Sequence, residues 1–322
     1  MRLCLAAILA CAPILACTLS SGPAVAQAVA QQPGPLVLPA PDAAEPGAIL
    51  AAAAEGDGAI ARYVQTWFDR VDQARASQPH WAAPLVTTTP LLIEQMRLDV
   101  YDQQLGNGAH LLNLGAGKGL ELIPTATNEV FVALPPWQER SNVKPVEGFA
   151  DWQFLLLKQR LASANEQDGN YVLTAFLAAQ APIGIPAYTS NAYVITPTLG
   201  GGKGFGDVVV QATSGLAVPS DHESLLGTAW TTNVSFQYKI ASLFWPEVEV
   251  NWTRWLDGAQ RGGKNQVFLT VGAVVGTVKL TDRLGVALGA GYQFAVAPTQ
   301  ELKPALTPTY KNNVVFSARM PF

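Results

Sequence analysis

Apolar side chains alternate with small or polar ones along most of the chain from Thr88 onward, and this two-residue period limits the possible folds more than any other feature. Successive side chains of a β-strand point to opposite faces, so the period marks strands with two different faces. In membrane barrels the large apolar side chains face lipid, and the small or polar ones face the interior. The clearest segment, 284–296, carries Val286, Leu288, Ala290, Tyr292, Phe294 and Val296 on one face and Gly285, Ala287, Gly289, Gly291, Gln293 and Ala295 on the other.

Twelve segments with this pattern can be drawn, and each is long enough for the ~9–11 residues with which a tilted strand crosses a bilayer. Single-chain bacterial barrels have an even number of strands, joined by short turns at one end and longer loops at the other. We therefore predict an all-β fold, a transmembrane antiparallel β-barrel of about twelve strands. The segments are 88–104, 110–125, 128–141, 150–165, 170–184, 192–206, 207–220, 225–242, 243–258, 265–282, 283–298 and 311–322.

The composition agrees with a chain that is solvated by lipid. Charged residues make up 14% of the sequence and hydrophobic residues 49%, whereas soluble proteins contain about 25% charged residues. Beyond the N-terminal region no apolar run reaches the ~20 residues of a membrane helix, which leaves a membrane barrel or a secreted all-β protein. The formal net charge of −4 gives no indication of nucleic-acid binding.

Residues 1–26 have the features of a signal peptide, which predicts export to the outer membrane of a Gram-negative bacterium. Residues 3–19 form the apolar stretch, and Ala24-Val25-Ala26 provides the cleavage site. An alternative is lipidation at Cys17, because Ile14-Leu15-Ala16-Cys17 resembles a lipoprotein cleavage box. No disulfide or thiolate metal site is expected in the mature chain, because all three cysteines precede the cleavage site.

Two further parts precede the predicted barrel, which we place at 79–322. Residues 27–58 are rich in Ala, Pro and Gln, a composition that predicts a disordered linker. Residues 59–78 are predicted to contain one short amphipathic helix in the periplasm, in which Ile60 and Val64 lie at helical spacing. The helix is expected to pack on the barrel rim; the alternative is that it partly plugs the interior.

The last strand carries the most specific signal. Its apolar side chains alternate up to the final residue, and this strand resembles the amphipathic last strand, with its terminal Phe, of outer-membrane barrels. The resemblance implies that the barrel-assembly machinery recognises this end of the chain. We assign the assembly signal to Phe322, Met320 and Phe316.

Charged residues on the inward faces of the predicted strands are candidates for lining a lumen. Both signs occur among them, which argues against strong ion selectivity. The candidates are Glu121, Lys239, Glu247, Glu249, Lys279 and Arg319.

Several short stretches resemble a family of proteobacterial outer-membrane transporter-like barrels, related to the barrel proteins of the phenol-degradation meta pathway. The resemblance runs patchily from residue 77 to residue 322, implies a transport role and transfers no catalytic residue. Its strand and turn signatures are Gln78-Pro79-His80-Trp81, Pro84-Leu85-Val86-Thr87 with Thr89-Pro90, Gly204-Phe205-Gly206-Asp207, Leu280-Thr281-Asp282-Arg283-Leu284 and Gly289-Ala290-Gly291-Tyr292-Gln293-Phe294.

The predicted function is that of a porin-like channel or transporter for a small solute, with a hydrophobic one among the candidates. Two alternatives stay open: a structural or plugged barrel without transport, and an outer-membrane lipid-modifying hydrolase. The hydrolase has little support, because His80, His110 and His222 stand in no metal-ligand spacing and the members of a triad rarely come from one loop such as 220–224. We expect no enzymatic activity and no cofactor. The expected partners are outer-membrane lipid, lipopolysaccharide, the barrel-assembly machinery and the solute, but no nucleic acid.

Overall fold

The computed structural model describes residues 58–322 with gaps at 116–118, 222 and 299–309. The predicted signal peptide and nearly all of the predicted linker lie outside the described residues. The labelled helices are α2 (Trp67–Ala76) and α3 (Glu223–Leu226), and no helix in the described part is long and apolar enough to cross a membrane. The strands are β1 (Gln95–Leu105), β2 (His110–Leu114), β3 (Gly119–Thr125), β4 (Asn128–Ala133), β5 (Trp137–Ser141), β6 (Val146–Phe149), β7 (Trp152–Ala164), β8 (Tyr171–Ala181), β9 (Val194–Phe205), β10 (Val208–Pro219), β11 (Ala229–Tyr238), β12 (Phe244–Trp255), β13 (Asn265–Lys279), β14 (Gly285–Ala297) and β15 (Tyr310–Pro321).

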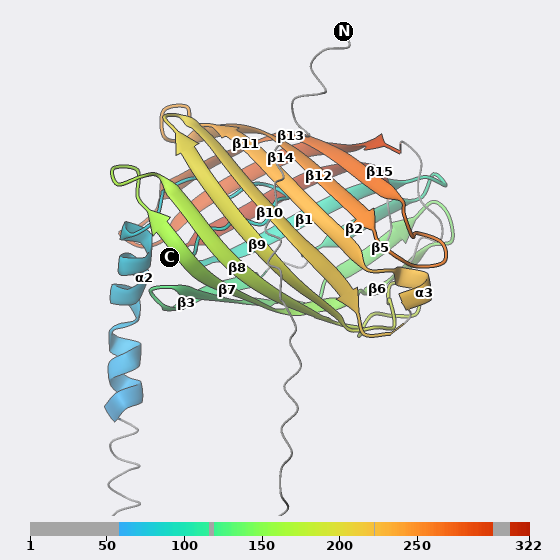
Figure 1. Cartoon of the computed structure of the whole chain (residues 1–322), viewed down its shortest axis with the longest axis horizontal. Helices are drawn as coiled ribbons and strands as arrows, with labels where there is room; N and C mark the ends of the chain where they lie inside the picture. Colours follow the sequence, from blue (N-terminus) through green and yellow to red (C-terminus); the bar gives the residue numbers. More distant parts are fainter. Residues whose placement is uncertain (1–57, 116–118, 222, 299–309) are drawn as a thin grey trace, which may run out of the picture. The chain divides into compact units, whose positions relative to one another are not determined.

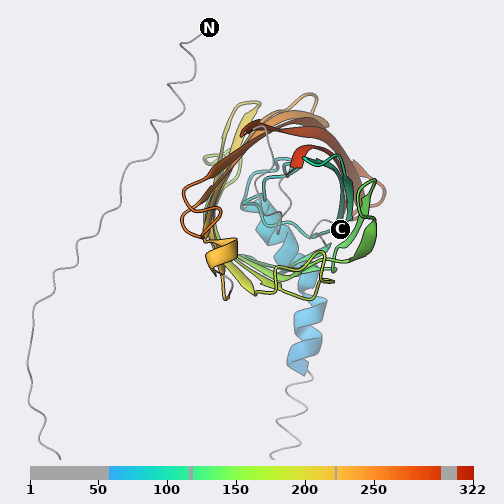
Figure 2. The ribbon, with the colours of Figure 1, turned by 90° about the vertical axis from the view of Figure 1, so that its right-hand side faces the viewer.

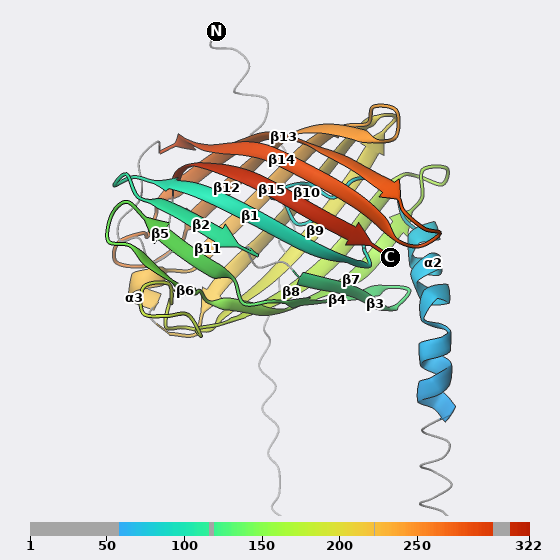
Figure 3. The ribbon, with the colours of Figure 1, turned by 180° about the vertical axis from the view of Figure 1, so that it is seen from behind.

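These fifteen strands form one closed antiparallel sheet (Figure 1). Three pairs of them, β2 with β3, β4 with β5 and β6 with β7, are successive pieces of interrupted strands that pair with the same neighbours. The wall therefore has twelve strands, which confirms the predicted fold class. β15 closes the ring by pairing with β1, from Gln95↔Pro321 to Leu105↔Tyr310 (Figure 3).

The two faces of the strands are those that the alternation predicts. Leu288 of β14 is 57% exposed while Gly289 is buried, and Phe316 of β15 is 55% exposed while Ser317 is buried. Exposed apolar side chains recur in the same way on the outside of the other strands. A closed ring leaves no unpaired sheet edge, so such a wall can lie in lipid, and this is the architecture of outer-membrane barrel proteins.

The predicted first strand, 88–104, is wrong at its beginning. β1 starts at Gln95, and residues 88–94 belong to an irregular segment inside the barrel. Pro90 has no backbone N–H to donate to a neighbouring strand. The backbone of this segment is bonded instead by side chains of the wall.

Residues 58–65 and α2 form a helix that lies across one end of the barrel (Figures 1 and 2). On the barrel side, Val71 and Ala74 are fully buried in a cluster with Leu92 and Ile123. The helix therefore sits at the rim, and it is the segment after the helix that enters the interior.

The connections at the helix end of the barrel are short. Five of them contain two to six residues: 126–127, 165–170, 206–207, 239–243 and 280–284. Three at the opposite end contain nine or more residues: 182–193, 220–228 and 256–264. Short connections at one end and longer loops at the other are typical of outer-membrane barrels, and the end with the short connections is called the helix end below.

Candidate functional site, a strap inside the barrel

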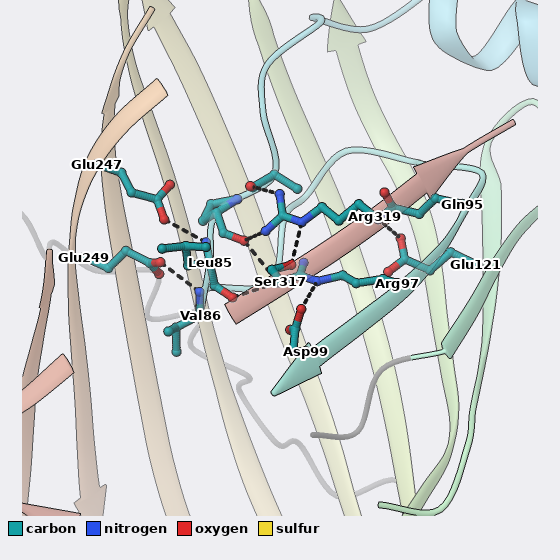
Figure 4. A network of polar contacts seen from close by, with 12 residues as sticks. Leu85, Val86, Gln95, Arg97, Asp99, Glu121, Glu247, Glu249, Ser317 and Arg319 are labelled. Carbon is teal, nitrogen blue, oxygen red and sulfur yellow. Dashed lines mark hydrogen bonds and ion pairs between the residues drawn. The ribbon is translucent and has the colours of Figure 1, made fainter. Parts of the chain in front are cut away.

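Residues 77–94, here called the strap, run from the end of α2 through the barrel interior to the start of β1 (Figure 4). Pro79, Pro84 and Pro90 keep the strap irregular, because proline neither continues a helix nor donates to a sheet. Most strap side chains are buried, and Leu85 is completely so. An irregular backbone in this position needs hydrogen-bond partners from the wall.

Two carboxylates of β12 bind backbone N–H groups of the strap. Glu247 Oε1 accepts from Leu85 N at 2.8 Å. Glu249 accepts from Val86 N at 2.8 Å and from Thr87 N at 2.5 Å (Figure 4). Alternation along β12 places both carboxylates on the inward face.

Two guanidinium groups on other strands bind carbonyls of Leu85 and of the two strap residues before it. Arg97 of β1 donates to Leu85 O at 2.7 Å and to Pro84 O at 3.2 Å. Arg319 of β15 donates to Pro84 O at 2.7 Å and also to Ala83 O. The middle of the strap is thus held between acceptors on one wall and donors on the other (Figure 4).

A buried ion pair holds the end of the strap. Glu129 of β4 and Lys158 of β7 lie 2.7 Å apart, with side chains 0% and 2% exposed. The carboxylate accepts from Ile93 N at 2.6 Å, and the ammonium donates to Leu91 O at 3.1 Å. The two side chains therefore bind the strap at Leu91 and Ile93 and also bind each other.

Glutamines of β10 and β11 connect the strap to the carboxylates. Gln211 donates to Ala82 O at 2.9 Å and to Gln237 Oε1 at 2.7 Å. Gln237 in turn donates to Glu247 Oε2 at 2.7 Å. The two glutamines thus link Ala82 of the strap to Glu247, and these hydrogen bonds offset the loss of water around the buried amide groups.

The side chain of Leu85 occupies a socket in the wall that is formed by glycines. A Cβ atom built on Gly272, Gly289 or Gly291 would lie 2.5–2.7 Å from a methyl carbon of Leu85. Only residues without a side chain allow the strap this close to β13 and β14.

Alanine at Gly272 is expected to destabilise the barrel by about 1–3 kcal/mol, the usual cost of overpacking. The added methyl group would meet Ala290 O at 2.6 Å in addition to Leu85. Gly201→Ala is the matched control, because its Cβ would find no neighbouring atom closer than 3.5 Å. Urea unfolding in detergent measures the free energy of unfolding of both variants. A Gly272→Ala variant as stable as the control would mean that Leu85 does not fill this socket.

The six predicted lumen residues divide into two groups. Glu247, Glu249 and Arg319 bind the strap directly, and Glu121 accepts from Gln95 Nε2 at 2.9 Å beside them. The other two lie near the helix end of the wall. Lys239 is partly exposed with its Nζ 5.8 Å from the Trp245 ring centre, and Lys279 is exposed.

Sequence reasoning missed four of the wall residues that hold the strap: Arg97, Glu129, Lys158 and Gln211. Each is a polar residue on the inward face of an alternating strand. That signal could have found them, because charged side chains inside a barrel need partners. What they bind could not have been predicted from the strands alone.

Two residues of the predicted assembly signal, Phe316 and Met320, belong to β15, and Phe322 directly follows this strand. Phe316 and Met320 face outward. Phe322 N donates to Glu94 O at 3.3 Å, and Phe322 O accepts from Arg75 at 2.7 Å. The end of the chain is thus tied to the helix and to the end of the strap.

An ion pair joins α2 to the turn between β13 and β14. Arg283 donates to Asp72 at 2.8 Å, and its guanidinium lies 4.3 Å from the Phe68 ring centre. The hydrogen bond from Arg283 lowers the pKa of Asp72 below its ordinary value. This contact therefore stabilises the docked helix above that ordinary pKa and is lost as the pH falls below it.

A chamber of about 420 Å³ lies at the helix end, between the strap, α2 and the wall. Its lining is mixed. Charged side chains come from Arg75, Lys279, Asp282, Arg283 and Arg319, and apolar ones from Trp81, Leu91, Leu92, Ile93, Val274 and Ala287.

The described residues contain no group of three or more metal-ligating side chains. His80 lies 3.1 Å from Glu166, and His110 lies 3.6 Å from Asp102. His222, from the loop weighed as a hydrolase site, lies outside the described residues.

The closed ring, with its apolar outside and polar inside, is a barrel of the outer-membrane type. No protein-family model and no curated protein matches the sequence. Among solved structures, the chain is similar to an outer membrane channel from Pseudomonas putida F1, with 14% identity, a TM-score of 0.47 and coverage of 73% of this chain and 97% of that chain. It is also similar to the NanC porin (8% identity, TM-score 0.44, 70% and 98% covered) and to an anion-selective porin from Comamonas acidovorans (8%, 0.32, 71% and 97%). These similarities concern the fold, and the relation to the phenol-degradation barrels is not confirmed by them.

Proposed function

We propose that the barrel lets a small solute cross the outer membrane and that the strap is the constriction on its path. The observation that carries this proposal is the polar network between wall and strap. A barrel filled only for stability is served better by apolar side chains, because burying charges costs nearly as much as their pairing returns. Polar contacts can be exchanged for water when the strap moves, as passage of a solute requires.

As part of this proposal we assign the helix end to the periplasm, because outer-membrane barrels have short periplasmic turns. The chamber at this end supports a small solute with an apolar part. Its volume of about 420 Å³ is within the ordinary range of small-molecule pockets. Leu91, Val274 and Ala287 offer apolar surface, and Arg75 and Lys279 offer charge at its edge. A twelve-strand wall is also intermediate between filled eight-strand barrels and the 16–18-strand porins with aqueous channels.

The double variant Glu247→Ala, Glu249→Ala is expected to raise the single-channel conductance several-fold, because three strap N–H groups lose their acceptors. Planar-bilayer recording measures this, alongside uptake of neutral sugars into vesicles. Glu147→Ala is the control, because this exposed glutamate of β6 lies in the wall away from the strap. An unchanged conductance in the folded double variant would contradict the role of the strap as constriction.

A plugged barrel without transport is the second candidate, and the number of wall strands that bind the strap favours it. Side-chain hydrogen bonds reach the strap from β1, β4, β7, β8, β10, β12 and β15. The same recordings separate the two. A wild-type barrel that conducts supports the channel, whereas a wild-type barrel that is silent in every condition supports the plug.

Delivery to the outer membrane forms part of the proposal. The signal peptide 1–26, or lipidation at Cys17 in its place, would take the chain across the inner membrane. The assembly machinery would then recognise the last strand through Phe322, Met320 and Phe316. Outer-membrane lipid and lipopolysaccharide would surround the apolar wall.

A further inference from the structure

The first part of the N-terminal helix, residues 58–65, here called the arm, extends beyond the barrel wall (Figure 2). Thr66 N still donates to Arg62 O at 3.0 Å, so the arm continues α2 in direction. Tyr63 marks the rim, because its hydroxyl donates to Pro124 O at the end of β3. The arm runs across the barrel axis, as a segment in the plane of the membrane would (Figures 1 and 2).

The barrel-facing side of α2 continues into the arm. At 3.6 residues per turn, positions seven and eleven residues before Val71 lie on the same side of the helix as Val71 itself. These positions are Val64 and Ile60. Val71 is fully buried against the barrel end, so Val64 and Ile60 point in the same direction outside the wall, toward the layer that surrounds the barrel.

Among the residues that the structure describes, none covers these two side chains. Ile60 is 65% exposed and Val64 62% exposed. The apolar outer surface of the wall reaches this end of the barrel, since Met320 faces outward only two residues before Phe322, which accepts a hydrogen bond from Arg75. The opposite side of the arm carries Arg62, which is exposed.

We propose that the arm is an interfacial anchor that binds the phospholipid layer on the periplasmic side of the outer membrane. Ile60 and Val64 enter the boundary between headgroups and acyl chains, and Arg62 stays in the aqueous layer. Helices with an apolar face on one side and charge on the other bury the apolar face about 5–10 Å into this boundary. The occupant is phospholipid because the arm leaves the wall at the level where lipid begins. The anchor is independent of whether the barrel conducts.

Nitroxide labels measure the depth of each side of the arm. Val64→Cys and Arg62→Cys are made in the full chain with its own three cysteines replaced by serine, labelled, and folded into vesicles of phosphatidylethanolamine and phosphatidylglycerol. Heat-modifiable migration on gels verifies that each variant is folded. Position 62 is the matched control, because it lies nine residues from Val71 and hence about 180° around the helix.

The label at position 64 should be reached by dissolved oxygen and protected from a water-soluble nickel complex, at a depth of about 5–10 Å, and the label at position 62 should show the reverse. Equal access of the nickel complex to both would overturn the anchor. Dipolar broadening of the position 64 spectrum would also overturn it, since a second copy of the chain would then cover the arm.

Discussion

Arginine at Val271 is expected to cost about 2–4 kcal/mol of the free energy of folding into lipid, whereas arginine at Val278 is expected to cost about 0–1 kcal/mol. Both valines belong to β13 and both are 50% exposed on its outer face. Val271 lies in the middle of the strand, next to the outward residues Val248 and Tyr292. Val278 lies near the helix end of the barrel. The cost depends on depth, because a charge at the midplane is far from water on both sides.

The two variants are an internally matched pair, with the same original residue, exposure and strand. Folding and unfolding in urea, in the presence of vesicles of two bilayer thicknesses, measures both costs. The Val271→Arg cost should rise with thickness, and the Val278→Arg cost should change little. Equal costs in both vesicles would show that the outer face meets no hydrocarbon layer, and the membrane assignment would fail.

Methionine at Lys158 is expected to destabilise the barrel by about 3–5 kcal/mol, because it leaves a buried carboxylate without its cation. Glu129 would keep only the hydrogen bond from Ile93 N. The strap would also lose the donor to Leu91 O. Chemical unfolding in detergent measures the loss.

The double variant Lys158→Met, Glu129→Gln is the control for the ion pair. It removes both charges while the amide oxygen can still accept from Ile93 N, so most of the stability should return. The interaction energy in this cycle should be at the upper end of the 0.5–3 kcal/mol range of coupled neighbours. Simple addition of the two single effects would show that Lys158 and Glu129 do not act as a pair.

The wall could be predicted from the sequence because the alternation is a local property. Each strand repeats the same rule, large outside and small or polar inside, so Leu288 and Phe316 were placed correctly without knowledge of their neighbours. The number of strands follows from the same rule, since each segment crosses the membrane once. A break such as that between β2 and β3 does not change the number of wall strands, because both pieces pair with β1.

The strap could not be predicted, because its shape depends on side chains that come from seven strands far apart in the chain. Leu92 and Ile93 continue the apolar character of the first strand, and only the absent N–H of Pro90 argues locally against it. Gly289 illustrates the same limit. Its inward position was correctly predicted. The alternation does not indicate what the residue contacts inside the barrel, however, and in the structure it contacts Leu85 of the strap.

Arg97 and Arg319 are register partners across the junction of the first and last strands. Like charges directly opposite each other weaken a strand pair, and here Pro84 O accepts hydrogen bonds from both guanidinium groups. Asp99 compensates Arg97 at 3.0 Å from the same strand. The strap therefore also stabilises the pairing of β1 with β15. If it were withdrawn, Arg97 and Arg319 would lose their shared acceptor and would face each other where the sheet closes. Under the proposed function, moving the strap to open a passage would weaken the pairing of β1 with β15. The loss of this pairing would limit how far the strap can move in an intact barrel.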